Sequence, residues 1–320
     1  VTALCGSLAA VASANAGSMT VKGGATATWS SNEATVTGNP IGMNKALGFA
    51  GSGELDNGWT VSYSQATSDA FALTSAALTI GMGSLGTLIF DQDTGADMGS
   101  ALDNVVPTAW EEADDGMDTG IIDVGSVNSG SLFHWTKSLD ALPGGSISAA
   151  YNAQVGGGYP ADGATGGGGT GTNGNGWDVA IKATPIDGLT VGAGYGEVEQ
   201  IHSEGNIDEQ TIYATYAVGG ITLGYQVGAV GTAGIGAAGY KNRYVGISYA
   251  VSDDLSISYN NTESNKLNAG FSPDSTYDSV SLSYSMGGMT INIADADCDN
   301  CSYTNNKTQD ERTISMSIAF

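Results

Sequence analysis

The sequence has no long hydrophobic run and very few basic residues. No stretch approaches the ~20 apolar residues that a membrane-spanning helix requires. Nine Lys and Arg residues stand against 33 Asp and Glu residues, which gives a formal charge of −24. This balance argues against nucleic acid as a partner and favours the attraction of cations. The missing hydropathy peaks do not exclude a membrane protein, because barrel strands of ~10 alternating residues give only a weak signal.

Cysteine and histidine are also scarce, with three and two copies respectively. Cys298 and Cys301 form a Cys-x-x-Cys pair in a polar segment near the C-terminus. A zinc site would need two further ligands, and His134 and His202 are the only histidines. We therefore predict that the two cysteines form a short disulfide, or are both free, and hold no structural metal.

The sequence offers little that could support catalysis. Neither histidine lies in a recognisable Ser-His-acid arrangement, so we predict that the protein is not an enzyme. Asp91, Asp93 and Asp97 place oxygen ligands at alternate positions around Gly95, which is typical of part of a calcium loop. The downstream bidentate Glu of that loop is missing. A calcium ion is a candidate here, and no other cofactor is predicted.

Two regions are distinguished along the chain. Residues 1–16 end in Ser13-Ala14-Asn15-Ala16, where small apolar residues precede an Ala-x-Ala site. This segment is typical of the tail of a secretory signal peptide. Residues 17–320 show short alternating segments throughout, and 49 glycines with only 13% charged residues favour strands and loops over long helices. We predict a signal-peptide remnant over 1–16 and one β-barrel over 17–320.

Period-two alternation predicts sixteen strands. In the last nine residues, Ile314, Met316, Ile318 and Phe320 share one face, and small polar residues occupy the other. The predicted strands are 18–30, 45–54, 58–66, 72–80, 84–90, 131–138, 146–153, 177–184, 189–196, 210–218, 221–230, 243–250, 254–260, 277–286, 289–295 and 312–320.

The connections between these strands alternate in length. Seven are tight turns, such as 55–58 and 287–288, and eight are longer and polar, such as 91–130 and 154–176. Short turns at one end and long loops at the other are typical of outer-membrane barrels. The sequence therefore predicts an all-β fold, a 16-stranded antiparallel transmembrane barrel with short periplasmic turns and long extracellular loops.

The two faces of each strand differ in chemistry. Val179 and Ile181 oppose Asp178, Ala180 and Lys182 in one strand, and the same contrast recurs in others. We predict that the apolar faces contact lipid and that the small polar faces line water, because about sixteen strands leave an aqueous channel. Aromatic residues near the strand ends predict two interfacial belts. Their members are Trp29, Tyr151, Trp177, Tyr195, Tyr259, Trp59, Tyr216, Tyr284 and Phe320.

The longest connection, 91–130, is strongly acidic. No Lys or Arg occurs between Lys45 and Lys137. The segment carries Asp91, Asp93, Asp97, Asp103, Glu111, Glu112, Asp114, Asp115, Asp118 and Asp123. It also contains the apolar groups of Val105-Val106-Pro107 and Ala109-Trp110, which a solvated loop does not need. We predict that it folds into the barrel as an inward third long loop. The alternative is an exposed acidic loop.

The sequence resembles general bacterial porins, especially those of alphaproteobacteria, in four features. These are the strand count, the terminal Phe320, the Ala14-Asn15-Ala16 site and the acidic loop with its Pro107-Thr108-Ala109-Trp110. The resemblance covers 17–320. It implies a homotrimer in the bacterial outer membrane, surrounded by lipid and lipopolysaccharide, that passes small hydrophilic solutes and ions by passive diffusion. It also implies a pore constriction at the third long loop.

The charges depart from the pattern of that family, in which bases on the wall face an acidic loop. By the alternation of side chains along each strand, few bases face the pore, namely Lys22 and Lys182. His134 is also predicted to lie on the pore wall. We therefore predict a cation-selective constriction formed by Asp91, Asp93, Asp97, Asp103, Glu111, Glu112, Asp114, Asp115 and Asp118. The poorly alternating strands 72–80 and 84–90, with the first and last strands, are predicted to form the trimer contact. The alternative to a porin is a secreted acidic all-β surface or adhesin protein, although no fixed repeat supports it.

Overall fold

The computed structural model describes residues 19–32, 38–68, 71–92, 102–117, 119–128, 130–157, 173–201, 205–231, 239–267, 270 and 272–319. Within these ranges, no helix has the length and apolar character needed to cross a membrane. Three short elements, η1 (Gly83–Leu85), η2 (Ser126–Asn128) and η3 (Cys301–Tyr303), are single 3₁₀ turns.

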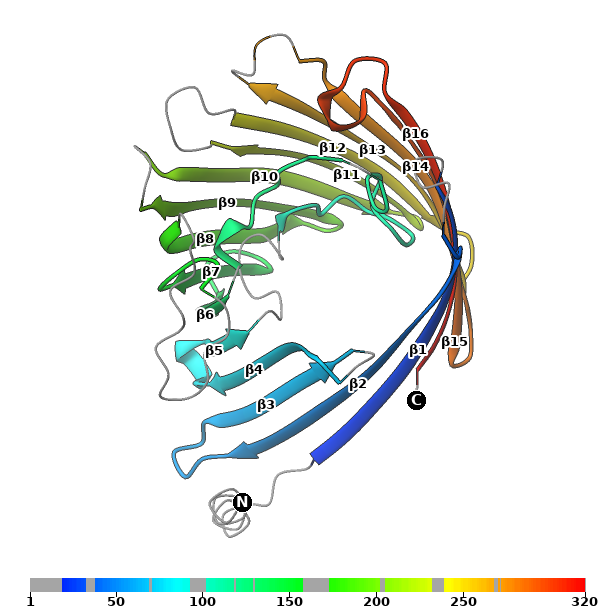
Figure 1. Cartoon of the computed structure of the whole chain (residues 1–320). Coiled ribbons are helices and arrows are strands. Elements are labelled where there is room, and N and C mark those ends of the chain that lie inside the picture. The colour runs from blue at the N-terminus through cyan, green and yellow to red at the C-terminus, as the bar shows by residue number, and fades with distance from the viewer. Residues whose placement is uncertain are drawn as a thin grey trace.

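Sixteen antiparallel strands close into one barrel, which confirms the predicted fold (Figure 1). Each strand pairs with its neighbours in sequence, and β1 pairs with β16 to close the ring. The strands are β1 (Met19–Asn32), β2 (Ile41–Glu54), β3 (Thr60–Thr67), β4 (Leu73–Gly81), β5 (Thr87–Gln92), β6 (Ser131–Leu139), β7 (Gly145–Asn152), β8 (Asn173–Ile186), β9 (Leu189–Gln200), β10 (Ile207–Val218), β11 (Ile221–Val230), β12 (Gly239–Ala250), β13 (Leu255–Leu267), β14 (Ser275–Met286), β15 (Met289–Asp299) and β16 (Thr308–Ala319).

Every predicted strand is present, but several are longer than predicted at the long-loop end. Strand β2 begins at Ile41 rather than at 45, β13 runs to Leu267 rather than to 260, and β15 runs to Asp299 rather than to 295. In β13 the extension carries polar residues on both faces, as in Asn261–Ser264. In β15 the faces exchange character, with Asp297 outward and Ala296 and Cys298 buried inward. The backbone ladder continues there while the hydrophobic alternation has ended, so a pattern of side chains does not mark it.

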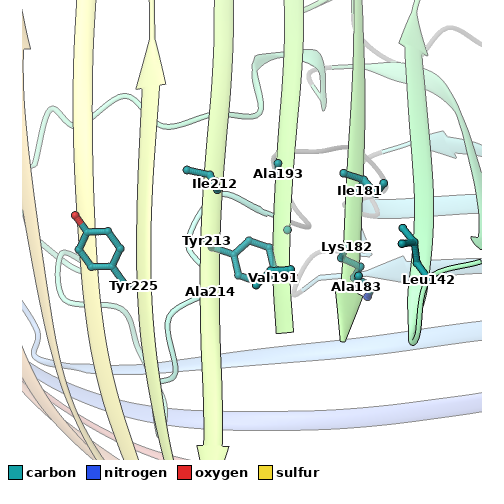
Figure 2. A pocket seen from close by; sticks show the side chains of 11 residues that line it. Leu142, Ile181, Lys182, Ala183, Val191, Ala193, Ile212, Tyr213, Ala214 and Tyr225 are labelled. Atoms are coloured by element: carbon teal, nitrogen blue, oxygen red, sulfur yellow. The ribbon is translucent and has the colours of Figure 1, made fainter. Parts of the chain in front are cut away.

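The outer face of the barrel is apolar and the inner face is polar or small. Val179 and Ile181 on β8 are 37% and 40% exposed, whereas the adjacent Asp178 and Ala180 are 1% and 6% exposed. Figure 2 shows part of the apolar surface over β8–β11, where Ile212 stands near the small Ala193. In a membrane this face contacts acyl chains, as the sequence predicted.

Aromatic side chains lie on the outer face near the strand ends. Trp177 and Tyr195 from adjacent strands pack with ring centroids 5.7 Å apart, and both are more than one third exposed. Tyr216 and Tyr284 lie at the short-turn end and are 41% and 40% exposed. Their positions agree with two interfacial belts. Phe320, predicted for one belt, lies outside the described residues.

We predict that replacing Ile212 by Arg destabilises the membrane-inserted barrel by about 2–4 kcal/mol, because a charge near the centre of an outward strand face contacts lipid. Ile212 is 63% exposed at the middle of β10. The measurement is urea unfolding in lipid vesicles. The Ile212→Leu variant is the control, and equal stability of the Arg and Leu variants would contradict a lipid-facing position.

Candidate functional site

The described part of the connection between β5 and β6 lies inside the barrel. Figure 1 shows it crossing the interior near β11 and β12, on the far side from β1 and β2. We call the described residues 102–117 and 119–128 the inner loop. Leu102 and Val124 pack with Ala180, Tyr213 and Val230 of the wall in one buried cluster. The predicted inward fold of this loop is therefore confirmed.

Polar wall side chains hold the first limb of the inner loop. Gln226 on β11 is fully buried, and its amide accepts a hydrogen bond from the Val105 backbone N–H at 2.7 Å and donates to the Leu102 carbonyl at 2.5 Å. Asn260 on β13 donates to the Pro107 carbonyl at 2.9 Å. The Ala109 backbone N–H donates to the Ser258 hydroxyl at 2.8 Å. These bonds satisfy backbone groups that have no strand partner.

The return limb is held in the same way. Asn242 on β12 donates to the Ile122 carbonyl at 2.9 Å. The buried Glu209 carboxylate on β10 accepts hydrogen bonds from the backbone N–H groups of Gly125 and Ser126, at 2.7 and 3.1 Å. Asn152 on β7 donates to the Val127 carbonyl at 2.9 Å. The loop is thus attached to the wall from β7 to β13.

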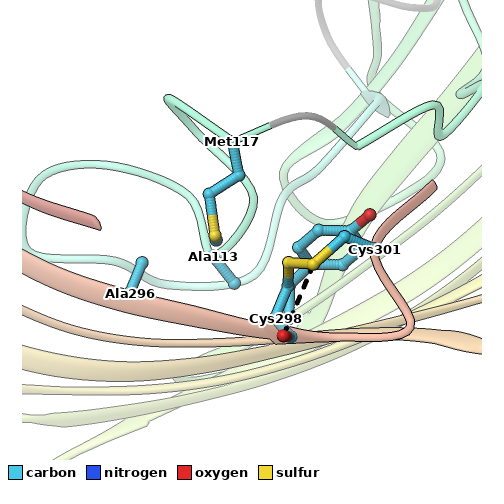
Figure 3. Close-up of a cluster of buried hydrophobic side chains, with 6 residues drawn as sticks. Ala113, Met117, Ala296, Cys298 and Cys301 are labelled. Carbon is cyan, nitrogen blue, oxygen red and sulfur yellow. Dashed lines mark hydrogen bonds between the residues drawn. A yellow bond between two sulfur atoms is a disulfide. The ribbon is translucent and has the colours of Figure 1, made fainter. Parts of the chain in front are cut away.

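The tip of the inner loop packs on the disulfide region of the wall. Ala113 and Met117 contact a buried cluster that contains Ala296, Cys298 and Cys301 (Figure 3). Cys298 and Cys301 are joined by a disulfide with their Cα atoms 5.7 Å apart. Tyr277, which belongs to the same cluster, donates a hydrogen bond to the Thr119 carbonyl at 2.9 Å. The Cys-x-x-Cys segment therefore supports the tip of the loop.

Four of the predicted carboxylates come together at this tip. Glu111, Glu112, Asp114 and Asp115 line a polar pocket of about 590 Å³, together with Trp110, Gly116, Met117 and Thr119. Asp115 is exposed and Glu111 is half-buried. Glu112 is exposed as a whole residue, but the loop closely surrounds its carboxyl group. Asp103 lies in the first limb and contributes negative potential at Glu112 and Asp114.

Burial and repulsion between like charges raise the pKa values of Glu111, Glu112, Asp114 and Asp123. Desolvation, followed by the charges of Asp115 and Glu311, raises the pKa of Glu111 to about 7. Desolvation and the charge of Asp103 raise the pKa of Glu112 to about 7. The pKa of Asp123 rises to about 8, mainly through desolvation. Raised values follow because ionisation would bring like charges together in a poorly solvated place.

Asp91 does not lie where the sequence placed it. It belongs to the end of β5, pairs in register with Leu132, and is completely buried. Its register with Ala77 and Leu132 places the side chain on the inner face, where other groups cover it completely, so it has no surface open to the pore. Asp93, Asp97, Asp118 and His202 lie outside the described residues. The calcium prediction, which involves Asp93 and Asp97, thus stays a prediction, and the described part of the chain contains no cluster of three metal-binding side chains.

Most basic residues lie away from the pore. All nine are in the described residues, and the strand registers place five of them on the outer face: Lys45, Lys137, Lys241, Arg243 and Arg312. Arg243 forms an ion pair with Glu263 at 2.6 Å, and Arg312 contacts Asp295, also on the outer face. The remaining four are Lys22, Lys182, Lys266 and Lys307.

The wall that lies across the barrel from the inner loop is nearly neutral. The strand registers place Gly, Ala, Ser, Thr and Asn on the inner faces of β1–β4. Thr26 of β1, for example, forms a hydrogen bond of 2.9 Å with Ser317 of β16. In these strands the charged residues on the inner face are Lys22 and Glu54, both toward the short-turn end. Lys182 is likewise near the short-turn end of β8. His134 lies on the inner face of β6, in register with Ile89 and Ala150.

Three charged residues of the site were not singled out from the sequence. Glu311 on β16 lies against Gly116 and raises the pKa of Glu111 through its charge. Glu209 holds the return limb. Lys266 lies 5.6 and 5.5 Å from the ring centroids of Tyr240 and Tyr303. Glu311 is two residues from the inward Thr313, and Glu209 is two residues from the inward Thr211. The alternation of the strands could therefore have placed both acids on the inner face.

Comparison with known proteins agrees with this geometry. A model of the Gram-negative porin family matches residues 1–311. The chain belongs to the Gram-negative porin family. No curated protein matches the sequence. As a porin it is an outer-membrane channel for passive diffusion and not an enzyme, as the sequence predicted. This assignment also removes the adhesin alternative.

Solved porin structures share the fold at low sequence identity. A mutant of the Rh. blastica porin matches with a TM-score of 0.65 and 14% identity over 95% of this chain and 100% of that chain. The anion-selective porin from Comamonas acidovorans matches with a TM-score of 0.65 and 13% identity over 95% and 100%. The trimer form of OmpT from Vibrio cholerae matches with a TM-score of 0.68 and 12% identity over 96% and 100%.

Proposed function

We propose that this porin is cation-selective and that the inner loop is its constriction. The observation that carries the proposal is the cluster of Glu111, Glu112, Asp114 and Asp115 on a loop held inside the barrel, opposite a wall almost without bases. Poorly solvated surroundings strengthen the field of such a cluster, so small cations are concentrated there and anions are repelled. The solutes are small hydrophilic molecules and ions.

The shared fold does not decide the sign of the selectivity. The Comamonas acidovorans porin has this fold and is anion-selective. The sign must therefore come from the residues that face the narrowest zone. In this chain five bases are on the outer face, where they act on lipid headgroups or on outward acids such as Glu263 and not on the pore.

We also infer that the chain is of the alphaproteobacterial type and begins with the remnant of a signal peptide over 1–16. Support comes from Ala14-Asn15-Ala16 and from Pro107-Thr108-Ala109-Trp110 in the acidic loop. The partners that follow are outer-membrane lipid and lipopolysaccharide. Nucleic acid is not among them, because a charge of −24 repels it.

We infer a homotrimer in which β4 and β5, with β1 and β16, form the contact. Strand β5 has only six residues, which rise about 20 Å along the strand and, at a tilt of ~45°, cover about 14 Å of a ~25 Å apolar band. A neighbouring subunit would cover the remainder. Leu78 and Phe90 stand outward here and are 45% and 37% exposed.

Replacing Leu78 by Asn should lower the fraction of trimer in mild detergent, because it places an amide in the subunit contact. Native mass spectrometry measures that fraction. Ile247→Asn, on the outer face of β12 and 41% exposed in the single chain, is the matched control and should leave the trimer intact. A wild-type protein found only as a monomer would overturn the inferred trimer.

Neutralising three loop acids, in Glu111→Gln/Glu112→Gln/Asp115→Asn, should reduce the cation-selective reversal potential roughly twofold, because it removes charge from the focusing zone. The measurement is the reversal potential across a bilayer in a gradient of dilute salt, where screening is weakest. The matched control is Asp278→Asn/Asp297→Asn/Asp310→Asn, a row of three acids on the outer face of β14–β16. Anion preference of the wild type, or equal potentials for both triple variants, would refute the proposal.

Acidification from pH 8 to pH 6 should weaken cation selectivity. Glu111 and Glu112, with pKa values of about 7, are ionised at pH 8 and protonated at pH 6, so the loop loses negative charge over this interval. The measurement is the reversal potential at several pH values. The Glu111→Gln/Glu112→Gln variant should lack this step. A wild-type potential that stays constant down to about pH 5 would show that both carboxyl groups titrate normally.

A further inference from the structure

Two glycines of the inner wall lie directly beneath the inner loop. Gly224 on β11 and Gly246 on β12 are directly paired across the two strands. A Cβ atom on Gly224 would lie 2.3 Å from Pro107 Cδ and 3.0 Å from Val106 Cα. A Cβ atom on Gly246 would lie 2.8 Å from both Asn260 Nδ2 and the Pro107 carbonyl oxygen, and 2.9 Å from Val106 Cβ. We call these two residues the glycine pair.

The backbone does not require glycine at either position. Neither Gly224 nor Gly246 has a positive φ, so an alanine could adopt both conformations. Glycine within a strand costs about 0.5–1 kcal/mol relative to alanine. The absence of side chains at these two positions matters because Val106 and Pro107 approach the wall closely, and their atoms would clash with an added Cβ atom.

The loop has little freedom to slide away from such a clash. Gln226, two residues along β11 from Gly224, binds the Val105 N–H and the Leu102 carbonyl. Asn260 pairs in register with Gly246 on the other side and donates to the Pro107 carbonyl. Because hydrogen bonds fix the segment on both sides of the glycine pair, an added methyl group would lift residues 105–109 off the wall and toward the lumen.

We propose that the glycine pair sets the aperture of the pore by fixing how far the inner loop stands from the wall. Gly224 and Gly246 are positioning residues, since they act through Val106 and Pro107 and not on the solute. The proposal uses the inner loop as the constriction proposed above, but it does not depend on the sign of the loop's charge.

Gly228 supplies a matched control on the same strand and the same face. A Cβ atom there would meet only Val124 Cγ1 at 3.9 Å and the Gln210 carbonyl at 4.0 Å, which are ordinary contacts. Alanine at 228 therefore adds the same methyl group to the inner face of β11 without displacing the loop.

The experiment compares single-channel conductance and sugar permeation in liposomes for the wild type, Gly224→Ala, Gly246→Ala and Gly228→Ala. We expect Gly224→Ala and Gly246→Ala to lower conductance roughly twofold and to exclude the largest sugar that the wild type admits, because a narrower constriction limits flux. Gly228→Ala should behave as the wild type. Wild-type conductance and permeation in both Gly224→Ala and Gly246→Ala would overturn the proposal.

A compensating change keeps the proposal decisive if the single variants fold poorly. Pro107→Ala removes Cδ, the atom nearest to a Cβ at 224. Gly224→Ala/Pro107→Ala should therefore regain folding, assessed by heat-modifiable gel mobility, and part of the lost conductance. Failure of that rescue, with Gly228→Ala folding normally, would refute the contact. Reduced conductance combined with anion preference would support the glycine pair and refute the proposed cation selectivity.

Discussion

The structure depends on satisfying the backbone of a loop inside a wide barrel. Sixteen strands leave an interior that side chains alone do not fill, so a segment that enters it brings unpaired N–H and C=O groups with it. On the inner face, polar side chains bind that backbone: Gln226, Asn260, Asn242, Glu209 and Asn152. An apolar wall would leave each of these groups unsatisfied at a cost of about 1–3 kcal/mol.

Holding the loop in place has an electrostatic consequence. The carboxyl groups of Glu111, Glu112 and Asp123 are each partly desolvated and each lie near other acids, and their pKa values of about 7, 7 and 8 exceed those of free carboxyl groups. Between pH 4.5 and 8 the folded chain therefore binds more protons at these groups than the unfolded chain does. By linkage, their contribution to stability falls as pH rises through this interval. Ionisation of these carboxyl groups therefore lowers the stability of the folded chain, and the hydrogen bonds between wall and loop offset this loss.

The sequence predicted the barrel well because membrane strands have a simple rule. Alternation at period two located all sixteen strands, and Trp110 with Val106 indicated a loop that packs. The same rule failed where polar residues occupy both faces, as at the long-loop end of β13, and where the polar residues face outward and the apolar ones inward, as at the long-loop end of β15. It also misplaced Asp91, because a single polar residue at a strand end does not show whether the ladder continues. Parity tells which face a residue occupies but not which loop residue lies opposite, so Glu311 could not be matched to Gly116.

Small inner residues serve two opposite purposes in this barrel. On β1–β4 their lack of bulk leaves room for water and solute, and their lack of charge leaves the field of the loop unopposed. On β11 and β12 the same lack of bulk lets Val106 and Pro107 lie against the sheet. Small side chains therefore shape the pore on both sides, and a single added methyl group has different effects at the two places. On the open wall of β1–β4 the methyl group would only displace water. Under the loop it would shift the loop and with it the carboxylates that the loop carries.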